Sequence, residues 1–158
     1  MVLSTTLSAE VRLPRFFSDH MVLQQQTSNA IWGWAEPGKT VKVKASWGTT
    51  VSVKASVNGK WKLFLKTPGH GTNHSLTITG RNTIRIKDVA IGEVWLCVGQ
   101  SNMGWSMGNS FEAEKEDNVN LPNYRIFRSR SDWGTCCKIS STHYSDGWLK
   151  SIDRLKRF

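Results

Sequence analysis

The chain has 158 residues, of which 39% are hydrophobic and 21% charged, and its formal net charge is +9. This length accommodates one full domain, or a small domain with part of another, and excludes two complete large domains. The composition is that of a globular protein and excludes a disordered chain. No apolar run approaches the roughly 18–20 residues that span a bilayer, and residues 1–10 lack the basic start and long apolar stretch of an intact signal peptide.

The positive charge is concentrated in the first part of the chain. Residues 1–90 hold 12 Lys and Arg against 4 Asp and Glu, whereas residues 91–158 hold 9 against 8. In the first part cations alternate with apolar residues, as in Val41-Lys42-Val43-Lys44. Because successive side chains of a strand point to opposite faces, the pattern predicts a solvated sheet face. A nucleic-acid surface is disfavoured, since no helix-turn-helix, RNA-reading aromatic or zinc-finger pattern accompanies the charge; acidic glycans or membranes are a further alternative.

Short alternating segments separated by turn residues fill the first ninety positions. They are residues 30–35, 40–47, 50–57, 61–67, 74–79 and 82–89. Between two of them, Asn58-Gly59 predicts a tight hairpin turn, because these residues tolerate positive φ. Strands at this spacing predict a β-sandwich-like domain over residues 11–90.

The aromatic and histidine residues of this part fit structural roles best. Aromatic side chains on alternating strands usually belong to a sandwich core, although a sugar-stacking platform is the alternative; these are Trp32, Trp34, Trp47 and Trp61. We interpret His20 as structural. His70 and His74 lie in a glycine-rich turn, where their spacing is weak support for a metal site.

At residue 91 the pattern changes. Residues 94–99 (VWLCVG) are continuously apolar, which predicts a strand covered on both faces in a parallel sheet, with Cys97 as a buried thiol. A loop follows, then residues 109–118, where Asn109 or Ser110 would cap a short helix, and then the predicted buried strand 123–127. Strand, loop, helix and strand open a doubly wound α/β domain.

These patterns predict a domain boundary near residues 89–92 and the start of an α/β domain over residues 91–128. Residues 129–158 have no sustained period, and we expect an irregular tail of unclear origin there. Cys136 and Cys137 are adjacent, which gives neither a disulfide framework nor zinc spacing, so they are left unassigned.

Ser101 lies just after the predicted strand 94–99. Ligands of open α/β sheets bind beyond the carboxyl ends of the strands, and backbone N–H groups in such a loop can donate to an oxyanion. A serine after a strand is nevertheless more often a turn or cap residue than a nucleophile. The residues alone leave both interpretations open.

Several blocks of the sequence, in order, resemble the start of the sialate O-acetylesterase family of SGNH-type serine hydrolases. They are residues 13–26, 32–43, 58–65, 82–103 and 121–127, and the resemblance covers residues 11–128. It implies a β-sandwich-like domain followed by the first βαβ portion of an SGNH, flavodoxin-like, α/β hydrolase domain. It also implies hydrolysis of acetyl esters of sugar hydroxyls through an acyl-serine intermediate, without metal or other cofactor.

The resemblance implies a role for one short block. Ser101 matches the family nucleophile, its own N–H would be one oxyanion donor, and Gly99, Gln100 and Asn102 would support the turn. The family's histidine base comes from a block further downstream, so we expect this chain to be an incomplete fragment that lacks it. His143 is the one histidine after Ser101, and it lacks the family's Asp-x-x-His context.

The expected partner is an O-acetylated sugar or glycan, with no nucleic acid and no membrane span, and the family resemblance suggests a secreted, periplasmic or lysosomal location. Two alternatives stay open. One is a non-catalytic β-sandwich module that binds a glycan or a partner, with Ser101 as a relic. The other is an esterase whose base another chain supplies.

Overall fold

The structure of the protein is a computed structural model that describes residues 10–99, 109, 111–112, 123–127 and 148–150. Within these residues the regular elements are β-strands joined by turns, and none is an α-helix. The strands are β1 (Val22–Gln24), β2 (Ser28–Trp34), β3 (Thr40–Ala45), β4 (Thr50–Lys54), β5 (Lys60–Lys66), β6 (Gly71–Thr79), β7 (Thr83–Gly92), β8 (Arg125–Ile126) and β9 (Leu149–Lys150).

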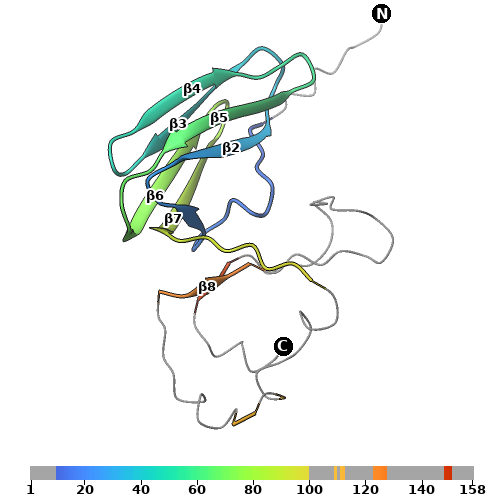
Figure 1. Ribbon diagram of the computed structural model, residues 1–158. Helices are drawn as coiled ribbons and strands as arrows, with labels where there is room; N and C mark the ends of the chain where they lie inside the picture. The colour runs from blue at the N-terminus through green and yellow to red at the C-terminus, as the bar shows by residue number, and fades with distance from the viewer. Residues whose placement is uncertain (1–9, 100–108, 110, 113–122, 128–147, 151–158) are drawn as a thin grey trace, which may run out of the picture.

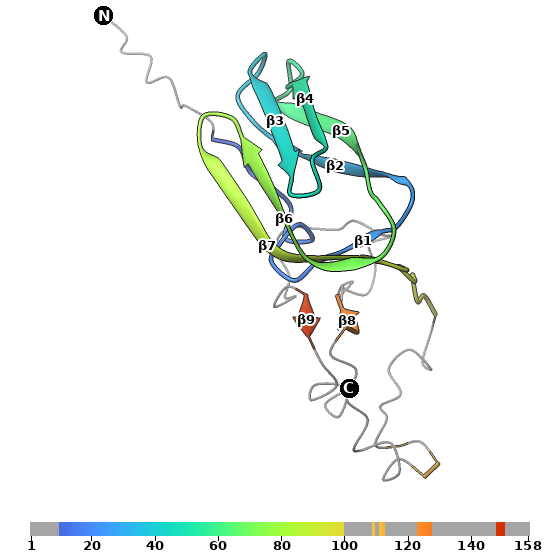
Figure 2. The same ribbon diagram turned by 90° about the vertical axis from the view of Figure 1, so that its left-hand side faces the viewer.

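Two sheets form the β domain. The larger has five strands in the order β1-β7-β6-β3-β4, in which β1 and β7 are parallel and the other pairs antiparallel. The smaller is the antiparallel pair β2-β5. Figures 1 and 2 show this pair facing the curled larger sheet, and the apolar core lies between them.

The predicted alternation is confirmed in the strands that build this core. Val41 and Val43 are fully buried, whereas Lys42 and Lys44 between them are exposed. On β5, the buried side chains of Trp61, Leu63 and Leu65 alternate with exposed residues in the same way. The cations of these strands therefore lie on outward faces, and the mostly β architecture expected for this part of the chain is confirmed.

The predicted turn at Asn58-Gly59 is present, but it does not close a hairpin. The Gly59 N–H donates to the Ser56 carbonyl at 2.8 Å, and Gly59 has φ of 70°, where glycine is favoured. The strands on either side belong to different sheets: β4 pairs with β3, and β5 pairs with β2. Turn chemistry is local, whereas a strand's partner depends on which sheet buries its apolar face.

The prediction of a buried strand at residues 94–99 is wrong for this structure. These residues form no strand, and the exposed fractions of Trp95, Leu96 and Val98 are 84%, 89% and 78%. Cys97 is a free, exposed thiol rather than a buried one. A continuously apolar strand is buried when it lies in a sheet that is covered on both faces, and none of the described strands pairs with this segment.

The segment at residues 123–127 does contain a strand, but a short and half-buried one. β8 comprises two residues and pairs antiparallel with β9, rather than in a parallel sheet. The βαβ arrangement is thus not observed in the residues that the structure describes. Most of the predicted helix 109–118 and of the tail 129–158, with Cys136, Cys137 and His143, lies outside the described residues.

Candidate active site

Of the predicted site, Gly99 alone lies within the described residues, at the exposed end of the segment that follows β7. Gln100, Ser101 and Asn102 lie outside the described residues. The structure therefore gives the geometry of the two segments that flank the predicted nucleophile, namely the exit from β7 and the segment around β8.

At the point where the chain leaves β7, the side chain of Glu93 forms hydrogen bonds. Its carboxylate accepts hydrogen bonds from Gln25 Nε2 at 2.6 Å and from Gln24 Nε2 at 2.8 Å. The Val94 N–H in turn donates to Gln24 Oε1 at 2.8 Å. The hydrogen bonds from Gln24 and Gln25 stabilise the carboxylate and lower the pKa of Glu93 below its ordinary value of 4.5. These contacts fix the direction in which the chain leaves the sheet toward Ser101.

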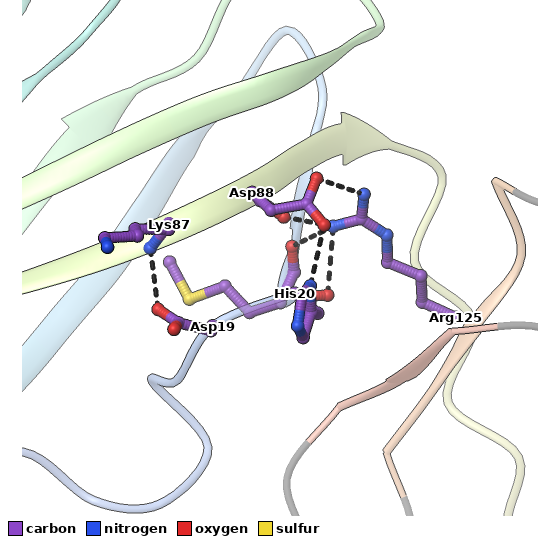
Figure 3. A network of polar contacts seen from close by, with 6 residues as sticks. Asp19, His20, Lys87, Asp88 and Arg125 are labelled. Atoms are coloured by element: carbon purple, nitrogen blue, oxygen red, sulfur yellow. Dashed lines mark hydrogen bonds and ion pairs between the residues drawn. The ribbon is translucent and has the colours of Figure 1, made fainter.

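A second set of contacts, the junction network, comprises His20, Asp88 and Arg125 (Figure 3). Arg125 Nη2 lies 3.0 Å from Asp88 Oδ1, and His20 Nδ1 lies 2.6 Å from Asp88 Oδ2. Arg125 Nη1 also donates to the backbone carbonyls of His20 at 3.0 Å and Met21 at 3.4 Å, and to that of Asp88. One guanidinium from β8 thus binds both the segment that leads into β1 and the middle of β7.

Burial makes this network strong. The side chain of Arg125 is 2% exposed and that of Asp88 17%, while His20 is 45% exposed. Charge-assisted hydrogen bonds of this kind are shorter and stronger than neutral ones, and arginine's planar fork suits several acceptors at once. His20 therefore has the structural role that we predicted, as a partner of Asp88.

Local backbone geometry directs the side chain of Asp88 toward its hydrogen-bond partners. In β6 and β7 the register shifts between His74↔Val89 and Leu76↔Ile86, which leaves an extra residue on β7. Asp88 lies in this bulge with φ of 52°, and His20 has φ of 69°. A bulge breaks the alternation of a strand and redirects a side chain, and Asp and His are among the residues that tolerate this backbone region.

Aromatic packing joins the same two parts of the protein. Phe127 follows β8 and meets Phe16 edge-to-face at 5.2 Å between ring centroids, and Trp148 lies 5.4 Å from Phe16. The Trp148 Nε1–H donates to the Phe16 carbonyl at 2.8 Å. Phe16 also stacks on Trp32. The β8–β9 region is therefore attached to the β domain by burial as well as by charge.

The tryptophans fit the core interpretation rather than an open platform. Trp61 is buried, and Trp32 and Trp47 are partly buried against the core. The Trp47 Nε1–H donates to the Lys66 carbonyl at 2.9 Å, and its ring meets His74 edge-to-face. Trp34 is half-buried.

Within the described part of the chain, no three His, Cys, Asp or Glu side chains come together as metal ligands. His74 instead lies with Nδ1 3.4 Å from Ser46 Oγ. Where the structure describes the chain, it also has no helix long and apolar enough to cross a membrane.

The sequence reasoning missed the junction network. Two irregularities pointed to it: Asp88 interrupts the alternation of residues 82–89 with a carboxylate, and Arg125 places a charge inside the apolar block 124–127. A charge within an otherwise buried segment needs a partner of opposite sign. Here these two charges are each other's partners.

Comparison with known proteins identifies relatives for most of the chain. The chain is 35% identical over 129 residues to the sialate O-acetylesterase of Mus musculus and 34% identical over 116 residues to that of Homo sapiens. These matches cover 73% and 66% of this chain, and 24% and 22% of the relatives. The chain thus spans about a quarter of the length of the curated relatives it matches. No family model matches the chain.

A solved structure is also similar. The crystal structure of a carbohydrate acetylesterase from Xanthomonas citri matches with a TM-score of 0.77 and 27% identity, over 89% of this chain and 32% of that one. The β architecture, the order of the sequence blocks and these matches together lead to one conclusion: the chain belongs to the sialate O-acetylesterase family.

Proposed function

We propose that this chain forms part of a carbohydrate O-acetylesterase that hydrolyses acetyl esters of sugar hydroxyls. The observation that carries the proposal is the 35% identity over 129 residues to a protein named sialate O-acetylesterase. The likeness to the carbohydrate acetylesterase from Xanthomonas citri supports the same class of substrate. The expected substrate is therefore an acetylated sugar or glycan.

In the proposed mechanism Ser101 is the nucleophile. Its Oγ attacks the acetyl carbonyl while a general base accepts its proton, and the tetrahedral oxyanion is held by backbone N–H donors, including that of Ser101. The sugar oxygen leaves with the proton, and an acetyl-serine remains. Water then attacks this ester, acetate is released and the serine is restored. Gly99, Gln100 and Asn102 would shape the turn that presents Ser101.

We assign the base to none of the described histidines. His20 is bound to Asp88, and His74 packs against Ser46 and Trp47 within the β domain. His70 lies in the turn before β6. A serine hydroxyl needs a neighbouring base to become nucleophilic. That the base is missing from this chain, or comes from another, stays a prediction.

We further propose that residues 91–128 begin an α/β catalytic unit and that residues 11–90 are its supporting β domain. The apolar side chains of Trp95, Leu96 and Val98 are supporting observations, because such a unit would cover them. Arg125 and Phe127 would attach this unit to the β domain. The glycan-binding module has less support, because Trp61 is buried and both Trp32 and Trp47 pack against the core.

The test compares two serines that are close in the sequence, in the full-length protein expressed from its gene. Acetate release from an O-acetylated sugar is measured for Ser101→Ala and for the matched control Ser106→Ala. We expect Ser101→Ala to lower kcat by a factor of about 10⁴ or more, as removal of a nucleophile does in other serine hydrolases. The control should stay within a few-fold of the parent, and an active Ser101→Ala protein would refute the assignment.

A further inference from the structure

On the outward face of the five-stranded sheet, the paired positions of β3, β4, β6 and β7 hold only hydroxyl-bearing and cationic residues. We call this the cationic face. Its residues are Thr40, Lys42, Lys44, Thr50, Ser52, Lys54, Thr77, Thr79, Thr83 and Arg85. All are exposed except Thr77, which is half-buried. They alternate with core residues such as Val43 and Ile78, so they share one side of the sheet.

The strand register sets these side chains in two rows. One row runs Thr50, Lys44, Thr77 and Arg85 across four strands, and the next runs Ser52, Lys42, Thr79 and Thr83. Neighbouring strands lie about 4.8 Å apart, and alternate residues along a strand about 7 Å apart. Lys44 and Arg85 are therefore separated by about 10 Å along a row, with the hydroxyl of Thr77 between them.

No carboxylate from the described residues 10–90 balances this face. Residues 1–90 contain four acidic residues, and none occupies a position on it: they are Glu10, Asp19, Glu36 and Asp88. Within the part of the chain that the structure describes, Lys42, Lys44, Lys54 and Arg85 make no ion pair. Opposite charges that face each other across strands stabilise a sheet, whereas like charges destabilise it. Here the cations repel one another, and a bound polyanion would relieve that repulsion.

We propose that the cationic face binds an acidic polysaccharide, through ion pairs to carboxylate or sulfate groups and hydrogen bonds from the threonine hydroxyls. The face has no aromatic side chain on which nucleic-acid bases would stack and no apolar side chain that would enter a bilayer. The choice of a sugar polymer rests in part on the proposed function. The face would hold an anionic glycan through residues other than those of the proposed catalytic turn.

The test measures binding of fluorescein-labelled polygalacturonate and dextran sulfate to the full chain at low ionic strength. The test variant combines Lys42→Glu, Lys44→Glu and Arg85→Glu. The matched control combines Lys60→Glu, Lys62→Glu and Lys66→Glu, which changes the net charge equally but lies on the exposed face of β5. We expect the test variant to weaken binding about tenfold or more and the control to weaken it far less. Added salt should weaken the binding of the parent protein.

Three outcomes would overturn the proposal: equal weakening by both variants, equal binding of neutral dextran, or tighter binding to DNA or to phosphatidylserine vesicles. Circular dichroism confirms that each variant is folded, and Lys42→Gln, Lys44→Gln and Arg85→Gln replace the test variant if it is not. Binding is repeated with Ser101→Ala. Because Ser101 is not one of the residues that define the cationic face, unchanged binding separates this proposal from the esterase activity, whichever way the activity test ends.

Discussion

Arg125 is the residue that connects β8 to the β domain. Its buried guanidinium donates to three backbone carbonyls and to the Asp88 carboxylate, and Asp88 is itself bound to His20. A buried charge is tolerated when its partners are in place and becomes costly when one is removed. The network therefore stabilises a particular attachment of the β8 segment.

Substitution of Arg125 should destabilise this attachment. We expect Arg125→Ala to lower the free energy of unfolding by about 2–4 kcal/mol, because Asp88 and the carbonyls lose a shared donor. Arg125→Lys should recover part of that loss, since an ammonium keeps the charge but not the planar fork. Urea denaturation measures the stability, and amide exchange of residues 123–127 measures the attachment.

Arg15→Ala is the control for this series, because Arg15 is exposed. A change within about 0.5 kcal/mol is expected there. If Arg125→Ala matched the control in both stability and exchange, the junction network would have no energetic role.

The contact of Glu93 gives the exit from β7 a defined pH dependence. The folded pKa of this carboxyl lies below 4.5 because Gln24 and Gln25 donate to it. The contact is therefore fully formed above pH 4.5 and is lost as the pH falls below that value through the lowered pKa. An NMR titration of the Glu93 carboxyl carbon should show its pKa rise toward 4.5 in the Gln24→Ala, Gln25→Ala variant. Gln26→Ala should leave the titration unchanged, and a similar shift in both variants would contradict the assignment.

Among the elements, β2 depends on close contact with the segment before β1. Arg12 and Trp34 exchange two backbone hydrogen bonds, at 2.8 and 2.9 Å. Gly33 makes room for this bridge, because a Cβ at that position would lie 2.2 Å from the Arg12 carbonyl oxygen.

Gly33→Ala should therefore force these segments apart and cost about 1–3 kcal/mol of stability. Gly69→Ala is the matched control, since a Cβ added there would have no neighbouring atom within 4 Å, and it should be neutral or slightly stabilising. Thermal unfolding followed by circular dichroism compares the two. Equal melting temperatures would show that these segments can move apart without loss of stability.

Period-2 patterning predicted the strands of the β domain, because one buried face forces alternation along β3 and β5. It could not predict their partners: the Asn58-Gly59 turn is local chemistry, whereas the crossing from β4 to β5 depends on the shape of the whole core. The prediction of a buried strand at residues 94–99 was wrong for a related reason. Its apolar character shows what the segment can bury, and burial depends on other elements that cover both of its faces.

The candidate site around Ser101 stays a prediction. The ordered blocks of the sequence carried a family resemblance, and the comparisons confirm it at the level of the family. Asp88 and Arg125 are 37 residues apart and belong to different segments, so no local pattern joined them. Their pairing depends on a bulge. In the sequence, the only sign of that bulge is a carboxylate at a position where the alternation calls for an apolar residue.

At the scale of the whole molecule, the β domain presents three different surfaces. The core side buries the apolar residues, the end near β1 and β7 receives the β8 segment, and the cationic face is open to solvent. We propose that the first two support a catalytic segment and that the third binds an anionic glycan. Together they would bring an acetylated sugar polymer to an esterase.

The most direct test of the central claim is chemical labelling of the nucleophile in the full-length protein. After treatment with a fluorophosphonate, peptide mass spectrometry should find one phosphonyl group on the peptide that contains Ser101, and Ser101→Ala should abolish it. A protein that releases acetate from sugars while its label falls on another residue, or on none, would contradict the account.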